Sequence, residues 1–147
     1  MPFKFLLFIP CVFASIAAPG GALGADLAFA QSFLTGSKQI VSFPVGNPVA
    51  MTVVGPQTDT FTGMDFDPGA RVLWAVDFTT QTVGTVNQTT GAYTASVALQ
   101  GTCCSALTID PVGGKFYVSK GDPNIYELNP TTGATTLVVR GAISGSA

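Results

Sequence analysis

Hydrophobic and polar residues alternate in short runs along the chain after residue 25, and clusters of Gly, Pro, Asn, Asp and Thr separate these runs. Alternation with a period of two is typical of half-buried β-strands, and such clusters are typical of turns. We find no convincing helical period of 3.6 residues. In the clearest part, the pattern predicts an antiparallel meander of four strands, at residues 61–66, 72–77, 82–87 and 93–99.

This meander occurs twice in the sequence, because residues 106–134 are a diverged repeat of residues 63–92. Asp67-Pro68 recurs 43 residues later as Asp110-Pro111, and Thr90-Gly91-Ala92 recurs 42 residues later as Thr132-Gly133-Ala134. The second copy predicts strands at 105–109, 115–119, 124–128 and 135–139. Before the first copy, the pattern predicts a partial unit with strands at 26–30, 40–43 and 51–54, and no first strand upstream of them.

Units of four strands at a period of about 40 to 45 residues are typical of β-propeller blades. The sequence therefore predicts an all-β fold of four-stranded antiparallel blades in an incomplete ring. We expect a partial blade at 25–60, full blades at 61–100 and 101–141, and a tail or the start of a further blade at 142–147. A ring needs at least about four blades, so we expect a fragment of a longer propeller, an open stack, or self-assembly of several chains.

The repeated residues also resemble a known family, the secreted bacterial-type propeller repeats with quinoprotein-like or YVTN-like blades. The resemblance implies blade architecture and says little about activity, since this fold hosts many unrelated functions. It rests on Gly63, Asp67, Pro68, Leu73, Trp74, Asn87, Thr90, Gly91, Ala92 and Thr94, and on Asp110, Pro111, Phe116, Tyr117, Leu128, Asn129, Pro130, Thr132, Gly133, Ala134 and Thr136.

The N-terminus has the layout of a secretory signal peptide. Lys4 precedes an apolar run at residues 5–18, and small residues follow it. We predict a signal peptide at residues 1–24 with cleavage before Ala25, and hence a secreted, periplasmic or cell-surface protein. The alternative is an uncleaved membrane anchor, which Pro10 and Pro19 disfavour because they interrupt the apolar run.

The amino-acid composition limits which partners and which catalytic or metal sites are compatible with this sequence. The chain has 10% charged residues, a net charge of −2 and no basic patch, so nucleic acid and anionic membranes are poor partners. It has no histidine, which excludes Ser/His and Cys/His nucleophile–base pairs and histidine-bound metals. Phosphate loops and dinucleotide fingerprints are also missing from the sequence. We therefore assign no catalytic residue, no cofactor and no metal site.

The candidate binding residues are those that differ between the two copies. We predict that Asp65, Arg71 and Asp77 belong to a ligand surface. The repeated Asp67 and Asp110 are instead expected to bond turn amides. Trp74 and Tyr117 hold equivalent positions; they are expected to fill the space between sheets, although they could line a ligand surface.

Cys103 and Cys104 are the least ordinary feature. A bridge between neighbours would be strained, because their Cα atoms are about 3.8 Å apart, below the usual disulfide range. It could rigidify the loop at 100–104, or each thiol could bond a residue of another blade. The pair also resembles the vicinal disulfide of secreted quinoprotein dehydrogenases, with Asn87 standing where their motif has Asp. Asn87 begins a glycosylation sequon, relevant in a eukaryote.

From these features we expect a secreted, non-catalytic module that binds or scaffolds an extracellular protein or glycan. The alternative is a fragment of a secreted propeller enzyme, either a quinone-dependent oxidoreductase or a carboxylate-based hydrolase or lyase.

Intact-mass measurement of the secreted protein tests both the predicted signal peptide and the predicted bridge between Cys103 and Cys104. The mature chain should begin at Ala25, and alkylation should add mass only after reduction if Cys103 and Cys104 form the predicted bridge. Retention of residues 1–24 would contradict the signal peptide, and two thiols that alkylate without reductant would contradict the bridge.

Overall fold

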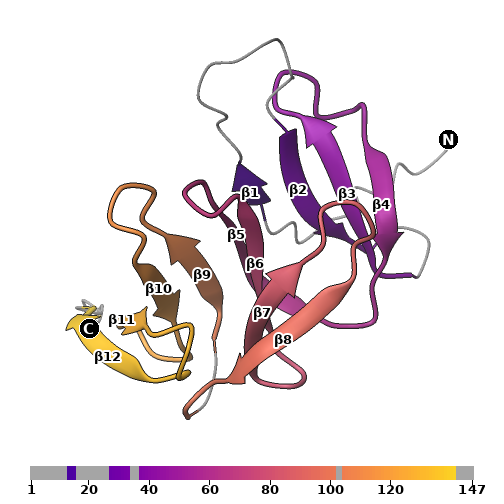
Figure 1. Cartoon of the computed structure of the whole chain (residues 1–147). Helices are drawn as coiled ribbons and strands as arrows, with labels where there is room; N and C mark the ends of the chain where they lie inside the picture. Colours follow the sequence, from indigo (N-terminus) through magenta and orange to yellow (C-terminus); the bar gives the residue numbers. More distant parts are fainter. Residues whose placement is uncertain (1–12, 16–26, 34–36, 102–103, 142–147) are drawn as a thin grey trace, which may run out of the picture.

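A computed structural model describes residues 13–15, 27–33, 37–101 and 104–141. These residues form three four-stranded antiparallel sheets (Figure 1), each made of strands that follow one another along the chain. The first sheet holds β1 (Phe13–Ser15), β2 (Leu27–Ser32), β3 (Gln39–Pro44) and β4 (Thr52–Pro56); the second holds β5 (Phe61–Asp67), β6 (Val72–Asp77), β7 (Thr82–Val86) and β8 (Tyr93–Ala98); the third holds β9 (Ala106–Ile109), β10 (Phe116–Ser119), β11 (Ile125–Leu128) and β12 (Thr135–Val139).

The all-β fold and the antiparallel pairing are as the sequence predicts, and the strands of the second and third sheets lie within one or two residues of their expected bounds. The first sheet differs, because β1 lies within residues 1–24 and pairs with β2. The sequence pattern predicted no first strand there. A short apolar run has no period that separates a buried strand from a signal-peptide core, so this strand could not be recognised.

An aspartate recurs at the end of the first strand in the second and third sheets, because it stabilises the turn that follows. Asp67 Oδ1 accepts hydrogen bonds from the backbone N–H groups of Gly69 and Ala70 at 2.9 and 3.1 Å. Asp110 Oδ1 accepts one from Val112 N at 2.9 Å. Both carboxylates therefore cap a β-turn, as predicted for aspartate in this position.

The Thr-Gly-Ala stretch is a second repeated turn. Asn87 Oδ1 accepts from Thr89 N and Thr90 N, each at 2.9 Å, and the backbone N–H of Gly91 donates to Asn87 O. Gly91 has a φ of 74°, a left-handed conformation that glycine adopts without a steric penalty. The third sheet repeats every part of this turn, with Asn129 and with Gly133 at a φ of 70°.

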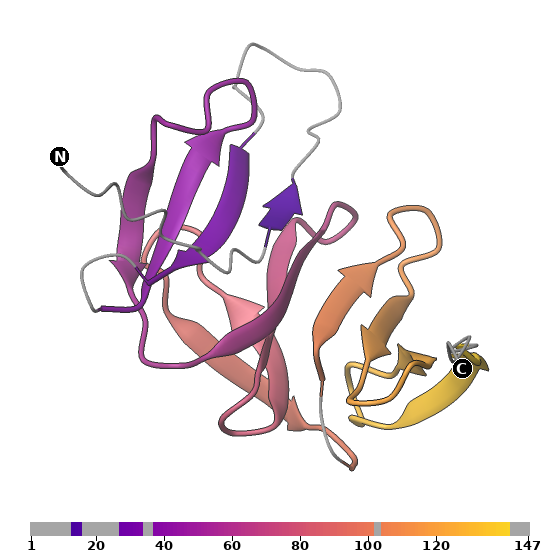
Figure 2. The same cartoon turned by 180° about the vertical axis from the view of Figure 1, so that it is seen from behind.

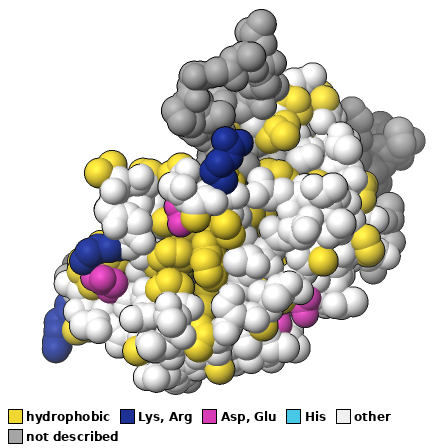
Figure 3. Space-filling view, viewed as in Figure 1, with side chains coloured by type: hydrophobic (Ala, Val, Ile, Leu, Met, Phe, Trp, Pro, Cys, Tyr) yellow, Lys and Arg dark blue, Asp and Glu magenta, His cyan; other side chains and the backbone are white. Residues whose placement is uncertain are grey.

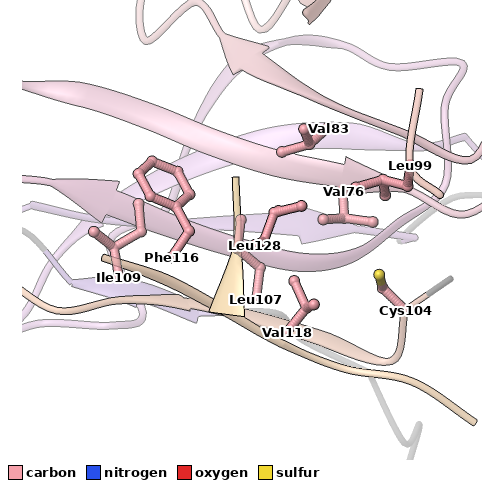
Figure 4. Packing of buried hydrophobic residues seen from close by; sticks show 9 residues of the cluster. All are labelled: Val76, Val83, Leu99, Cys104, Leu107, Ile109, Phe116, Val118 and Leu128. Carbon is pink, nitrogen blue, oxygen red and sulfur yellow. The ribbon is translucent and has the colours of Figure 1, made fainter. Parts of the chain in front are cut away.

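The second sheet is the centre of the fold, because it buries both of its faces. One face packs against Phe29 and Ile40 of the first sheet. The other face packs against the third sheet in the cluster of Figure 4, which consists of Val76, Val83, Leu99, Cys104, Leu107, Ile109, Phe116, Val118 and Leu128.

Trp74 lies beside this second cluster, and its ring meets the Phe116 ring edge-on, with the centroids 5.1 Å apart. Its Nε1 is buried and has no hydrogen-bond partner in the described part of the chain. Trp74 thus fills the space between two sheets, as the sequence predicts.

The sheets meet along their first strands. β5 contacts both β1 and β9, and the three strands lie side by side in both views (Figures 1 and 2). A Cβ at Gly63 would lie 2.2 Å from Leu107 N and 2.7 Å from the Ala106 carbonyl carbon. These are backbone atoms of the neighbouring sheet, so glycine is required at this crossing.

Gly63→Ala should therefore lower the free energy of unfolding by about 1–3 kcal/mol, because the added methyl group forces the second and third sheets apart. Chemical denaturation followed by circular dichroism measures the change. Gly46→Ala is the matched control, since a Cβ added at Gly46 would meet no heavy atom within 4 Å, and should change stability by less than about 0.5 kcal/mol. Equal stabilities of the two variants would contradict the close approach.

Candidate functional site

An apolar groove lies where the three sheets come together. It has a volume of about 380 Å³ and is lined by residues that follow β2 and β6 or begin β5 and β9. Phe33 and Phe78 are 37% and 52% exposed although both are large and apolar. Exposed aromatic rings at a concave site are typical of ligand-binding surfaces. The lining residues are Phe33, Thr60, Phe61, Thr62, Phe78, Cys104 and Ser105.

Hydrogen-bonding groups in the walls of this groove are bonded within the protein. Thr62 Oγ1 donates to Cys104 O at 2.6 Å, and Lys38 Nζ donates to Thr60 Oγ1 at 2.7 Å. The backbone N–H of Phe78 donates to Thr60 O at 2.8 Å. The groove offers a ligand mainly apolar contact through the exposed rings of Phe33 and Phe78.

Gln31 holds the floor of the groove in place. Its side chain is fully buried; Nε2 donates to Asp59 O at 2.8 Å, and Oε1 accepts from Phe61 N at 3.0 Å. A buried amide with both ends bonded fixes the backbone that it joins. Gln31 thus ties the end of the first sheet to the start of β5.

Asp77 lies at the end of β6, directly before Phe78, and is fully buried. Its carboxylate accepts hydrogen bonds from Thr60 N, Thr79 N and Thr80 N at 3.0 to 3.1 Å, and from Thr80 Oγ1. Burial alone would raise the pKa of Asp77, but these hydrogen bonds together lower the pKa below its ordinary value of 3.8. Asp77 is therefore not on an exposed ligand surface, and it positions Phe78.

Asp65 bridges two sheets. Its Oδ2 accepts from Thr108 Oγ1 at 2.9 Å and from Ile109 N at 2.7 Å, while its Oδ1 accepts from Phe66 N at 2.8 Å. Thr108 stands at the position equivalent to Asp65 in the next repeat. The structure thus assigns Asp65 a contact between β5 and β9.

Arg71 is exposed in the turn between β5 and β6, with a φ of 59°. It lines a shallow hollow of about 400 Å³ at the turn end of the second sheet. The third sheet has an equivalent hollow of about 670 Å³, lined by Lys115 and Glu127 among others. There Glu127 forms an ion pair with Lys115 at 3.0 Å and raises the pKa of that amine. Hollows that recur in successive sheets are features of the repeat itself.

The three predicted ligand residues do not form one site. Arg71 and Asp77 lie at opposite ends of β6, which spans Val72–Asp77, or roughly 17 Å at the usual rise of a strand. Asp65 lies between them on β5, opposite Trp74. The sequence identified positions where the repeats differ, and these positions are spread over the sheet.

Cys104 is buried and disulfide-bonded. The predicted bridge to its neighbour involves Cys103, which lies outside the described residues, as does Cys11. Asn87 is exposed, and its side-chain oxygen caps the turn as described above. Its glycosylation stays a prediction.

Two phenylalanines that the sequence pattern did not identify, Phe33 and Phe78, flank the groove. Phe33 and Phe78 each follow a second strand by one residue, and so hold equivalent places in the first and second sheets. That shared place is a signal that an alignment of the first unit could have revealed. This signal is hidden in the sequence because the loops of the first and second units differ in length, so equivalent residues are not a constant number of positions apart.

In the described ranges, no group of three or more Cys, Asp or Glu side chains lies close enough to hold a metal ion. The same ranges contain no helix long and apolar enough to cross a membrane. On the face seen in Figure 3, charged side chains are few and scattered, whereas hydrophobic side chains gather near the centre.

Asp77→Asn should lower the free energy of unfolding at pH 7 by about 1–3 kcal/mol, because the amide cannot accept the same set of hydrogen bonds. The pKa of Asp77 is lowered in the folded protein, so its contribution is complete above the ordinary value of 3.8. It is lost as the pH falls from there through the folded-state pKa. The difference between wild type and variant should therefore shrink below about pH 4.

Denaturation curves between pH 2 and pH 7 measure this difference. Glu127→Gln removes an exposed carboxylate and is the control, with little expected change. A constant difference between wild type and Asp77→Asn at every pH would contradict the role of the charge.

The chain matches no protein-family model and no curated protein. Among solved structures, it is similar to a protein of unknown function from Bacteroides thetaiotaomicron, with a TM-score of 0.60 and 17% identity, over 76% of this chain and 30% of that chain. The computationally designed Ika8 protein aligns with a TM-score of 0.45 and 13% identity, over 85% of this chain and 35% of that chain. The chain therefore spans well under half the length of either protein. The first likeness supports an all-β fold of antiparallel sheets.

Proposed function

We propose that the chain is a secreted, non-catalytic binding module built of propeller-type blades, and that the groove between Phe33 and Phe78 is its binding site. The groove carries this proposal, because it combines a concave apolar wall with two exposed aromatic rings. Its volume of about 380 Å³ falls within the range of about 300–1,000 Å³ that small-molecule sites occupy.

The blade assignment is supported by the way the sheets meet. The second and third sheets are four-stranded meanders, and their first strands β5 and β9 lie next to one another (Figure 2). Cleavage before Ala25 would remove β1 and leave three strands in the first sheet. Propeller blades also place their first strands around a common axis. In that arrangement, the groove lies near the axis, at the end where each second strand finishes and the next first strand begins.

The hydrogen bonds that the aspartate carboxylates accept favour a binding role over a catalytic one. Asp65, Asp67, Asp77 and Asp110 all accept hydrogen bonds from backbone amides. These are the groups on which a carboxylate-based hydrolase would depend, and each is engaged in holding a turn or joining two sheets. Secretion is supported by the disulfide of Cys104, since such bonds persist in oxidising compartments.

The ligand of this groove is a flat apolar group, such as an aromatic ring. Glycan binding relies on many hydrogen bonds to hydroxyl groups, whereas the exposed large side chains of this groove are the apolar rings of Phe33 and Phe78. These rings favour an apolar ligand ring over a sugar. Phe33 and Phe78 would contact its two sides through offset or edge-to-face packing.

Fluorescence titration with the neutral aromatic probe N-phenyl-1-naphthylamine tests this proposal. The wild-type protein should bind the probe, and the double variant Phe33→Ala/Phe78→Ala should bind it at least about tenfold more weakly, or by about 1.4 kcal/mol. Both rings are partly exposed, so their removal should leave the fold intact, as circular dichroism would show.

Val49→Ala and Val112→Ala are matched controls, because these side chains are 85% and 95% exposed outside the groove. Both should bind the probe as the wild type does. Equal affinity in all variants would contradict the site, and binding of cellobiose without binding of the probe would contradict the ligand class.

A further inference from the structure

Arg71 is set apart from the other charged residues by its backbone conformation. It has a φ of 59°, in the left-handed region that residues other than glycine adopt at a steric cost. The third sheet has Gly114 at the equivalent position, 43 residues later, with a φ of 64°. The second sheet therefore carries an arginine where glycine suits the turn better, and strained residues of this kind cluster at functional sites.

The side chain of Gln88 holds this turn in place. Its Nε2 donates to Arg71 O at 3.0 Å. The bond joins the turn between β5 and β6 to the turn between β7 and β8, which lies at the same end of the second sheet (Figure 1). Both residues line the shallow hollow of about 400 Å³ described above. Gln88 thus fixes the backbone from which the Arg71 side chain extends.

Two threonine hydroxyl groups lie in the same hollow. Thr85 pairs directly with Thr94, and paired residues share a face of the sheet. Both side chains are at least partly exposed and line the hollow. Neither hydroxyl group has a hydrogen-bond partner within the described ranges, so each can donate and accept. The hollow therefore offers hydroxyl groups as well as a cation to a polar ligand.

The equivalent hollow of the third sheet has a different charge arrangement. Lys115 and Glu127 line it and neutralise each other as an ion pair at 3.0 Å. Glu127 corresponds to Thr85, 42 residues earlier, so the second sheet lacks this acid. Asp67 lies in the same turn as Arg71 and caps it through Oδ1. Neither Asp67 nor another carboxylate of the described part of the chain forms an ion pair with Arg71.

We propose that the hollow at Arg71 binds a small hydroxylated carboxylate, such as a uronic acid. The planar guanidinium of Arg71 binds the carboxylate through two parallel hydrogen bonds, and Thr85 and Thr94 bond the hydroxyl groups. One cation balances the single charge of a carboxylate, whereas a phosphate carries up to two. The volume of about 400 Å³ suits a small ligand. This inference rests on the comparison of repeats and is independent of the groove between Phe33 and Phe78.

Titration of isotope-labelled protein with glucuronate, followed by NMR, tests the proposal. Glucuronate should shift the backbone amide signals of residues 71 and 85–94. Methyl glucoside lacks the carboxylate and should not shift them at the same concentration. Arg71→Gly should bind glucuronate at least about tenfold more weakly. This variant should lose no thermal stability, because glycine adopts the turn conformation without a steric penalty.

Three further variants separate charge from shape. Thr85→Glu gives the hollow the acid that the third sheet has at this position, and should weaken binding as Arg71→Gly does. Arg71→Lys keeps the positive charge and should bind glucuronate more tightly than Arg71→Gly. The double variant Phe33→Ala/Phe78→Ala leaves the hollow unchanged and should bind glucuronate as the wild type does.

Three results would overturn the proposal. The first is a wild-type protein that does not bind glucuronate, and the second is equal binding by the wild type and a folded Arg71→Gly variant. The third is a ligand preference other than the proposed one, shown by equal shifts with methyl glucoside or by tighter binding of inorganic phosphate than of glucuronate.

Discussion

The contact between β5 and β9 is the constraint on which the rest of the structure depends. At Gly63 the two first strands come so close that a single methyl group would collide with the backbone of the next sheet. Two residues along, the carboxylate of Asp65 accepts hydrogen bonds from Thr108 and Ile109 across the same gap. This spacing lets Trp74 and Phe116 meet at 5.1 Å, and it places the start of β9 beside the groove.

Much of the fold follows from local chemistry, and the sequence therefore predicts it. Alternating polarity marks the strands, and Asp67 and Asn87 mark the turns because their side chains bond amides two or three residues away. Such interactions need no knowledge of distant residues. The repeat adds the division into sheets, because each unit copies the same set of turns.

The site could not be predicted in the same way, since its residues come together only in three dimensions. Asp65 was expected on a ligand surface, but its partner Thr108 is 43 residues away and belongs to another sheet. Asp77 was expected there as well, and it is buried because the start of β5 folds over it. Phe33 and Phe78 each follow a second strand by one residue, but loops of different length hide this equivalence in the sequence.

Trp74 offers the most direct measurement of the central claim, that the second and third sheets pack face to face. It is the single tryptophan of the chain, and its Nε1 is buried between those sheets. The account predicts blue-shifted native emission that resists quenching by acrylamide, and a red shift on unfolding that coincides with the loss of β-sheet signal in circular dichroism. Native emission like that of a fully hydrated indole, with full access to the quencher, would contradict it.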